Sequence, residues 1–403
     1  MTEELAEVEN YPCAEPRAPI FLVPEQVSLA KAISQLLEGF GPLAIDAERA
    51  SGFRYSSRAY LIQLFRSGCS TFLVDPVATG DLSAVTNSLA GIEWIIHAAS
   101  QDLACLREVG IEPKILFDTE LGARLAGLPR VGLRAVVRDL LGLSLAKEHS
   151  AADWSKRPLP KEWLHYAALD VELLPQVRDK VYEILEKDGK TELAAEEFQA
   201  QLKLKKASAR AEPWRRLSGL HRVRGARALA IARELWEERD RLAEERDEAP
   251  GRLVPDSSII SAVIANPGSQ TDLAKLKEFH GRASRTDLER WWAAINRGRE
   301  TEDLPTLRKG GDGPPPPRSW SDKNPEAARR LASARETLGK IAEETKIPVE
   351  NLLLPETLRN LCWEPPGMLS PSSVKKYLEE KGARNWQIAL TAGKLAAAFV
   401  DSS

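Results

Sequence analysis

The chain has 403 residues, which is too long for one ordinary domain and predicts two or three. Its 43% apolar content can fill several cores, yet no apolar run approaches the roughly 18–20 residues that span a bilayer, so we expect no membrane association. The net charge of −3 argues against a uniformly basic protein. Four scattered cysteines without a CxxC pair argue against a zinc site and a disulfide framework, and the acidic start at 1–10 argues against a signal peptide. Together these features favour a cytoplasmic location.

The first half of the chain combines short apolar runs, typical of strands, with longer segments of helical periodicity. Strands are expected at 21–23, 42–48, 60–65, 71–74 and 94–97. Helices are expected at 29–40, 101–109, 119–126, 133–141 and 162–186. Mixed strands followed by helices predict a central sheet covered by helices.

Strand patterns stop after about residue 195, and the second half is predicted to be helical. A long charged helix is expected at 224–245, and a second helix after Pro255, with Asp256 or Ser257 as its cap. The Gly- and Pro-rich segment 301–323 is interpreted as a linker. Ala232-Arg233-Glu234 before Pro255 is repeated by Ala334-Arg335-Glu336 before Pro355, which predicts a duplicated helical domain.

Two carboxylates end the predicted strand 42–48. Asp46 and Glu48 are one residue apart, and on a strand such residues point to the same side. Acids this close repel each other unless a cation neutralises them, and Mg²⁺ and Mn²⁺ prefer carboxylate oxygens. The pair indicates a metal site, although a pair of this kind also occurs at solvated strand ends.

Two later segments complete the pattern. Asp102 falls in the first turn of helix 101–109, where an acid also suits the helix dipole. Tyr166 and Asp170 are four residues apart and share one helix face. Four carboxylates suit two metal ions that clamp the attacking and leaving oxygens of a phosphoryl displacement, and the tyrosine hydroxyl can orient the attacking water.

The order of these motifs resembles the ribonuclease D family, in the Tyr subclass of the DEDD superfamily of 3′→5′ exonucleases. The resemblance covers roughly residues 18–195 and includes the flanks 61–64, 117–119 and 153–159. It implies a ribonuclease H-like α/β domain with a mixed sheet flanked by helices. It also implies that two Mg²⁺ or Mn²⁺ ions are held by Asp46, Glu48, Asp102 and Asp170, and that Tyr166 positions the water.

Several residues near the motifs are candidates for substrate contact. Gln63 lies in one flank, His97 ends a strand, and Lys147 can hold a backbone phosphate. His97 is not expected to be a metal ligand, because hard metals favour oxygen. The segment 49–59 is rich in Arg and Ser, which suits either phosphate contact or a solvated loop.

The helical half resembles the helicase-and-ribonuclease-D C-terminal (HRDC) domain over about 214–297. We therefore expect an exonuclease domain at 18–200, an HRDC domain at 210–300, the linker, and a second HRDC-like all-α domain at 324–403. Ten Lys or Arg and one acid lie between 201 and 233, so Trp214, Arg215 and Arg216 are candidate RNA contacts through phosphate attraction and base stacking. Alternatively, the arginines of this segment pair with acids of the exonuclease domain.

These features predict a 3′→5′ exoribonuclease that releases nucleoside 5′-monophosphates and trims 3′ ends of structured RNA such as tRNA precursors. Two alternatives stay open. The same carboxylates also serve a DNA exonuclease, because the motifs do not distinguish the two sugars. A non-catalytic RNA-binding scaffold is the second alternative.

Overall fold

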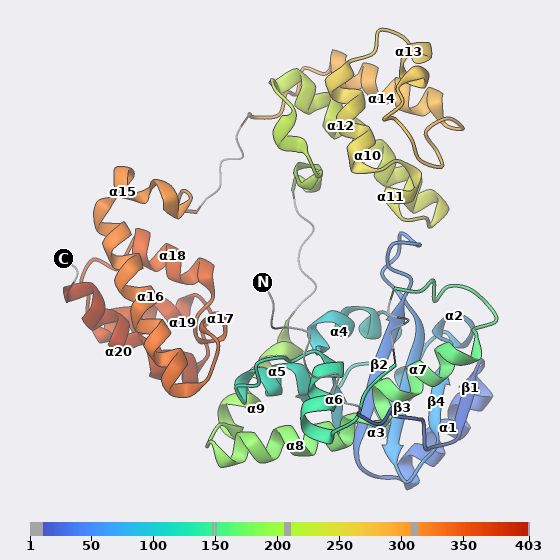
Figure 1. Ribbon diagram of the computed structural model, residues 1–403, viewed down its shortest axis with the longest axis vertical. Coiled ribbons are helices and arrows are strands. Elements are labelled where there is room, and N and C mark those ends of the chain that lie inside the picture. Colours follow the sequence, from blue (N-terminus) through green and yellow to red (C-terminus); the bar gives the residue numbers. More distant parts are fainter. Residues whose placement is uncertain (1–10, 147–148, 150, 205–210, 308–312, 402–403) are drawn as a thin grey trace.

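The computed structural model describes residues 11–146, 149, 151–204, 211–307 and 313–401. Three units follow one another along the chain: an α/β unit up to residue 204, a helical unit from 211 to 307, and a second helical unit from 313 to 401 (Figure 1). All four cysteines are free thiols, as expected. Among the described residues, no helix is both long enough and apolar enough to cross a membrane.

Six strands of the first unit form one mixed sheet in the order β1-β4-β3-β2-β5-β6. Strand β3 runs antiparallel to both of its neighbours, whereas β5 is parallel to β2 and to β6, and β1 is parallel to β4. Strand β2 therefore lies in the interior of the sheet. The bounds are β1 Ile20–Val23, β2 Phe40–Arg49, β3 Ala59–Ser67, β4 Thr71–Val74, β5 Glu93–Ile96 and β6 Ile115–Asp118.

Helices cover both faces of this sheet (Figure 1). On one side of β2, Leu43 and Ile45 pack in a core that includes the buried face of α1; on the other, Ala44 packs against Val171 and Leu174 of α7 and α8. Because strand residues alternate, Asp46 and Glu48 share the Ala44 side and point toward α7. The helices of this unit are α1 Gln26–Glu38, α2 Pro76–Thr79, α3 Ser83–Leu89, α4 Ala99–Glu108, α5 Thr119–Leu125, α6 Leu133–Leu141, α7 Lys161–Glu172, α8 Leu174–Lys187 and α9 Thr191–Lys203.

The predicted central sheet covered by helices is confirmed, but individual elements differ. The predicted helix 162–186 is two helices, because Pro175 lies in the first turn of α8 and cannot continue the hydrogen-bond ladder of α7. The predicted helix 29–40 ends earlier, since Phe40 starts β2. Strand β6 was not predicted as a strand, because its short apolar run leads directly into the helix expected at 119–126.

The two helical units repeat one order of elements. Helices α10 Ala226–Arg246 and α16 Pro325–Thr345 are both 21 residues long. Each ends in a left-handed residue, Asp247 (φ 45°) and Lys346 (φ 54°), and a four-residue helix follows, α11 Pro250–Leu253 or α17 Val349–Leu352. The two units thus share an order of elements, and the duplication of one domain stays a prediction. The remaining elements are η1 Pro213–Arg216, η2 Leu220–Arg222, α12 Asp256–Ala265, α13 Gln270–Lys275, α14 Leu288–Glu300, η3 Pro317–Ser319, α15 Trp320–Lys323, α18 Pro355–Trp363, α19 Pro371–Glu380 and α20 Asn385–Asp401.

Two local predictions in the helical half are wrong. Pro255 is the N-cap residue of α12, and the Asp256 carboxylate accepts hydrogen bonds from Ser218 N (2.8 Å) and Arg239 (2.7 Å) instead of capping its own helix. The predicted linker 301–323 extends too far. Trp320 is fully buried in the third unit, where its ring centroid lies 5.1 Å from that of Trp363.

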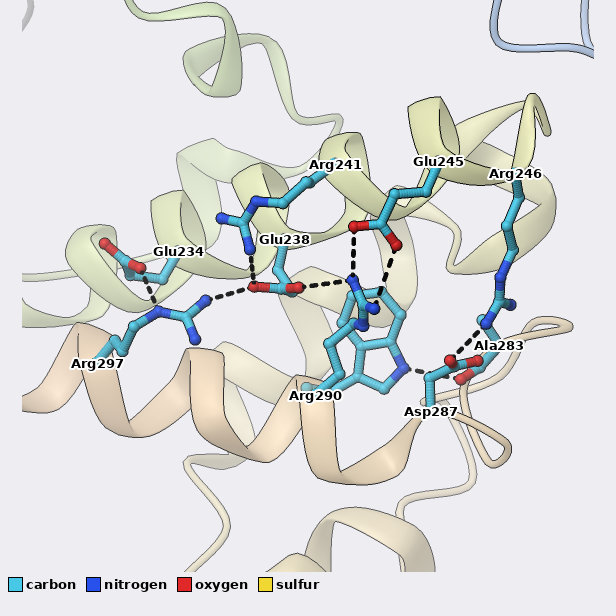
Figure 2. A network of polar contacts seen from close by, with 10 residues as sticks. Glu234, Glu238, Arg241, Glu245, Arg246, Ala283, Asp287, Arg290 and Arg297 are labelled. Atoms are coloured by element: carbon cyan, nitrogen blue, oxygen red, sulfur yellow. Dashed lines mark hydrogen bonds and ion pairs between the residues drawn. The ribbon is translucent and has the colours of Figure 1, made fainter.

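Helices α10 and α14 of the second unit are joined by a network of acids and arginines (Figure 2). Glu238 is 3% exposed and accepts from Arg241 (2.7 Å), Arg290 (3.1 Å) and Arg297 (2.6 Å). These arginines stabilise the unit internally, because each of them is paired with a carboxylate of α10.

Candidate active site

Three carboxylates meet at the end of β2. The oxygens of Asp46 and Glu48, from β2, and of Asp170, from α7, include ligand atoms that all lie within 4.8 Å of one another. Glu48 and Asp170 are buried, at 7% and 6% exposure. Such a compact set of oxygen donors is the type of site that hard divalent cations occupy.

Asp102 lies beside this cluster, in the first turn of α4, and is 4% exposed. It is close enough to Asp46 for a carboxyl–carboxyl hydrogen bond. It also pairs with Arg49, whose Nη2 lies 3.1 Å from Oδ1 and whose Nη1 donates to Gln101 O at 2.8 Å. A register shift between Glu48 and Arg49 marks an irregularity where β2 turns this arginine toward α4. The structure thus brings all four predicted acids together and adds an arginine that sequence reasoning had treated only as part of a loop.

The acids of this cluster are hard to ionise together. Burial, followed by the charges of Asp46 and Asp170, raises the pKa of Glu48 to about 10. Burial and the charge of Asp46 raise the pKa of Asp102 to about 8, and burial raises the pKa of Asp46. A cation placed among these oxygens would reverse this effect, because an opposite charge favours the ionised form. The donor chemistry therefore fits a divalent metal centre.

Tyr166 is held against the cluster by its neighbours on both sides. Its hydroxyl hydrogen-bonds to Asp170, one helical turn further along α7. Its ring meets the His149 ring edge-on at 5.7 Å and lies 6.4 Å from the buried Trp154 ring. Burial and the nearby carboxylates raise the pKa of Tyr166, so the side chain stays a phenol at neutral pH. It can orient a water molecule but cannot serve as a phenolate base.

A cavity of about 710 Å³ opens over these residues. It is lined from β2, from the turn into α4, from α6 and from α7. Besides the carboxylates and Tyr166, its lining includes His97, Glu120 and the arginines Arg49, Arg130, Arg134 and Arg138. The last three of these arginines recur every four residues, a sequence pattern that could have indicated this basic lining.

The predicted substrate-binding residues of the α/β unit fall in different places. His97 lines the cavity; its Nδ1 lies 2.9 Å from Thr119 Oγ1, and burial lowers its pKa to about 4, so the ring is neutral. Gln63 is completely buried in β3, directly across from Asp46, so direct contact with a substrate is contradicted. Lys147 lies outside the described residues.

The candidate RNA contacts of the second unit are mostly unavailable. Trp214 is 2% exposed, and Arg215 lies over its ring at 4.4 Å, so base stacking by Trp214 is contradicted. Arg215 pairs with Glu212 of its own unit at 2.7 Å, not with an acid of the α/β unit. Arg216 is exposed.

Asp118 positions the turn that carries Asp102. It caps α5, accepting from Glu120 N (2.9 Å) and Leu121 N (3.1 Å). Its carboxylate also accepts from Ala98 N and Ala99 N, both at 3.0 Å, where Ala98 adopts a left-handed conformation (φ 60°). A single buried acid thereby fixes the start of α4. Sequence reasoning missed this second role, because the two turns are brought together only by the sheet.

Three family models match the chain in succession. They are a 3′-5′ exonuclease over residues 22–186, an HRDC domain over 228–295 and a 3′ to 5′ exonuclease C-terminal domain over 313–399. The α/β unit and the helical unit that follows it thus correspond to the expected types of domain. The third unit matches a model other than HRDC.

Relatives of known type agree with these matches. A ribonuclease D of Granulibacter bethesdensis is 30% identical over 336 residues, which cover 77% of this chain and 83% of that protein. A protein from Bifidobacterium adolescentis is similar in structure with a TM-score of 0.83 at 37% identity, over 95% of this chain and 100% of that chain. Escherichia coli RNase D, an exoribonuclease involved in structured RNA processing, gives a TM-score of 0.66 at 25% identity, over 91% of this chain and 100% of that chain. The chain therefore belongs to the ribonuclease D family of 3′→5′ exoribonucleases.

Proposed function

We propose that this exoribonuclease trims the 3′ ends of structured RNA, such as tRNA precursors, by hydrolysis at two divalent metal ions. The observation that carries the proposal is the cluster of buried carboxylates at the base of a cavity of about 710 Å³. Burying several acids without a cation is costly, so a site of this kind is retained for its chemistry. The family relationship provides the direction of attack, from the 3′ end.

Asp46, Glu48 and Asp170 would hold one ion, and Asp102 together with Asp46 would contribute to the second. Mg²⁺ or Mn²⁺, when bound, supplies positive charge for the phosphate oxygens and lowers the pKa of water. The proposal assigns no covalent nucleophile to the protein. Water would attack the terminal phosphodiester and the 3′ oxygen of the preceding nucleotide would leave, so the products would be nucleoside 5′-monophosphates.

The remaining residues of the cavity would bind and orient the RNA terminus. Tyr166 keeps its proton and holds the attacking water by hydrogen bonding. His97, neutral and fixed through Nδ1 by Thr119, can present Nε2 to a ribose hydroxyl, the group that distinguishes RNA from DNA. The exposed Arg216 can contribute to RNA binding by the helical half.

Digestion of a 3′-extended tRNA, read at nucleotide resolution with and without Mg²⁺ or Mn²⁺, tests the proposal. A single-stranded DNA of matched length serves as the comparison. We expect a metal-dependent ladder that shortens from the 3′ end on RNA and stops at the structured body. Equal or faster digestion of the DNA would contradict RNA as the substrate, and unchanged cleavage after complete metal removal would contradict the metal-dependent mechanism.

A further inference from the structure

We propose that Arg130, Arg134 and Arg138 form a phosphate-binding wall that holds the RNA backbone upstream of the cleaved bond. The proposal rests on the ribonucleolytic function of the carboxylate site and adds the path that the substrate strand takes. Neither the motifs nor the predicted substrate contacts included these residues.

The wall and the acids line one cavity. Arg130 precedes α6, and Arg134 and Arg138 are on α6, all three lining the same cavity as Asp46 and Asp170. Arg134 and Arg138 are four residues apart and share one face, and the helix buries Val136 and Val137. Four residues of α-helix rise about 6 Å, which is comparable to the separation of adjacent phosphates in an extended strand.

The first turn of α6 adds to the positive potential. Gly132, Leu133 and Ala135 also line the cavity, and the N-terminal end of a helix carries a partial positive charge. Arg134 donates to Ala146 O at 2.9 Å, which fixes the direction of its side chain. Arg138 pairs with Asp139 at 2.7 Å, and this acid of the same helix reduces the charge available to a substrate.

A second cavity offers the strand an alternative path, and its charge disfavours that path. This space of about 860 Å³ lies between the loop after β2, helix α4 and the end of α10, and it shares Arg49 and Gln101 with the first cavity. Its lining contains Glu108, Glu244 and Asp247, and Arg58 of this lining lies 3.8 Å from Asp247. Acids lining a groove repel a polyanion, so the upstream phosphates pass along α6.

The experiment compares the full-length wild type with Arg130→Gln, Arg134→Gln, Arg138→Gln and the triple variant. Substrates are a single-stranded RNA octamer and a dinucleotide, which has only the phosphate that is cleaved. We expect the KM of the octamer to rise on the order of tenfold in the triple variant. The slope of log KM against log salt should fall by about 0.7 for each phosphate that the protein no longer neutralises. The kcat for both RNAs and the KM of the dinucleotide should stay unchanged.

Two further variants sharpen the comparison. Asp139→Asn releases Arg138 and should lower the KM of the octamer and steepen its salt dependence, which a general loss of stability would not do. Lys31→Gln removes an exposed cation from α1, outside this cavity. This control should change neither the KM of the octamer nor its salt dependence. The proposal is overturned if octamer KM and salt slope stay at wild-type values in the triple variant, or if the dinucleotide is affected equally. Cleavage by the wild type would still support the proposed function in either case.

Discussion

The cluster of acids at the end of β2 combines burial with mutual repulsion. Asp46 and Glu48 could be predicted from sequence because the geometry of a strand places residues i and i+2 on one side, and the helical spacing of Tyr166 and Asp170 works in the same way. Burial of Gln63 depends on the register between β2 and β3, which no local pattern reveals.

Glu48 should make the metal-free protein less stable as pH rises. Its pKa is about 10 in the folded state against 4.5 ordinarily, so between these values the folded protein binds a proton that the unfolded chain has released. Stability contributed by the protonated form is therefore complete below about 4.5 and is lost as pH approaches 10. In EDTA, Glu48→Gln should become progressively more stable than wild type across this window, measured as Tm against pH. Parallel curves for the two proteins would contradict this cause.

Tyr166→Phe should lower kcat for RNA about a hundredfold, because the water loses the hydroxyl that orients it. KM and Tm should change little, since the ring contacts with His149 and Trp154 remain. Steady-state kinetics on a short RNA measure the effect. Tyr182→Phe on α8, where the ring lies 4.8 Å from the Arg178 guanidinium, is a matched control that should retain wild-type kcat. An equal decrease in both variants would argue against the assigned role.

At the level of elements, prediction succeeded where an apolar pattern stands alone and failed where the pattern continues into the next element. Helix 133–141 has the predicted bounds of α6, because its apolar residues recur clearly at helical spacing. The division between α7 and α8 was missed, although Pro175 is visible in the sequence, because the apolar period continues across it. The α10–α14 pair was likewise beyond prediction, since it joins acids and arginines some 50 to 60 residues apart.

Glu238→Gln should destabilise the second unit by about 1–3 kcal/mol, because a buried acceptor of three arginine hydrogen bonds loses its charge. Faster hydrogen exchange in α10 and α14, which the network of Figure 2 joins, would report the destabilisation. Glu336→Gln, which removes an exposed partner of Lys340 on α16, should leave exchange in its own unit unchanged. Unchanged exchange in the Glu238 variant would show that the network does not hold the two helices together.

At the scale of the whole molecule, both helical units contact the α/β unit. Ala249 N of the second unit donates a hydrogen bond to Phe53 O, in the loop after β2 (3.0 Å). From the same loop, the Tyr55 hydroxyl donates to Asp240 of α10 (3.1 Å). Trp386 of the third unit donates to Glu197 at 3.0 Å. The number of units and the α/β or all-α class of each could be predicted from length and periodicity. Their contacts could not, because interfaces join residues that no sequence spacing relates. The same holds inside the second unit, where Trp214 is buried in the core.

The most direct test of the proposed centre is Asp46→Asn, studied by cleavage of a 5′-labelled RNA and by calorimetric titration with Mn²⁺. Asp46 belongs to the three-carboxylate cluster and lies against Asp102, so one substitution changes the surroundings of every acid of the site. We predict a folded protein with undetectable cleavage and weakened Mn²⁺ binding. Wild-type cleavage with wild-type Mn²⁺ affinity in this variant would contradict the assignment of these carboxylates as the catalytic centre.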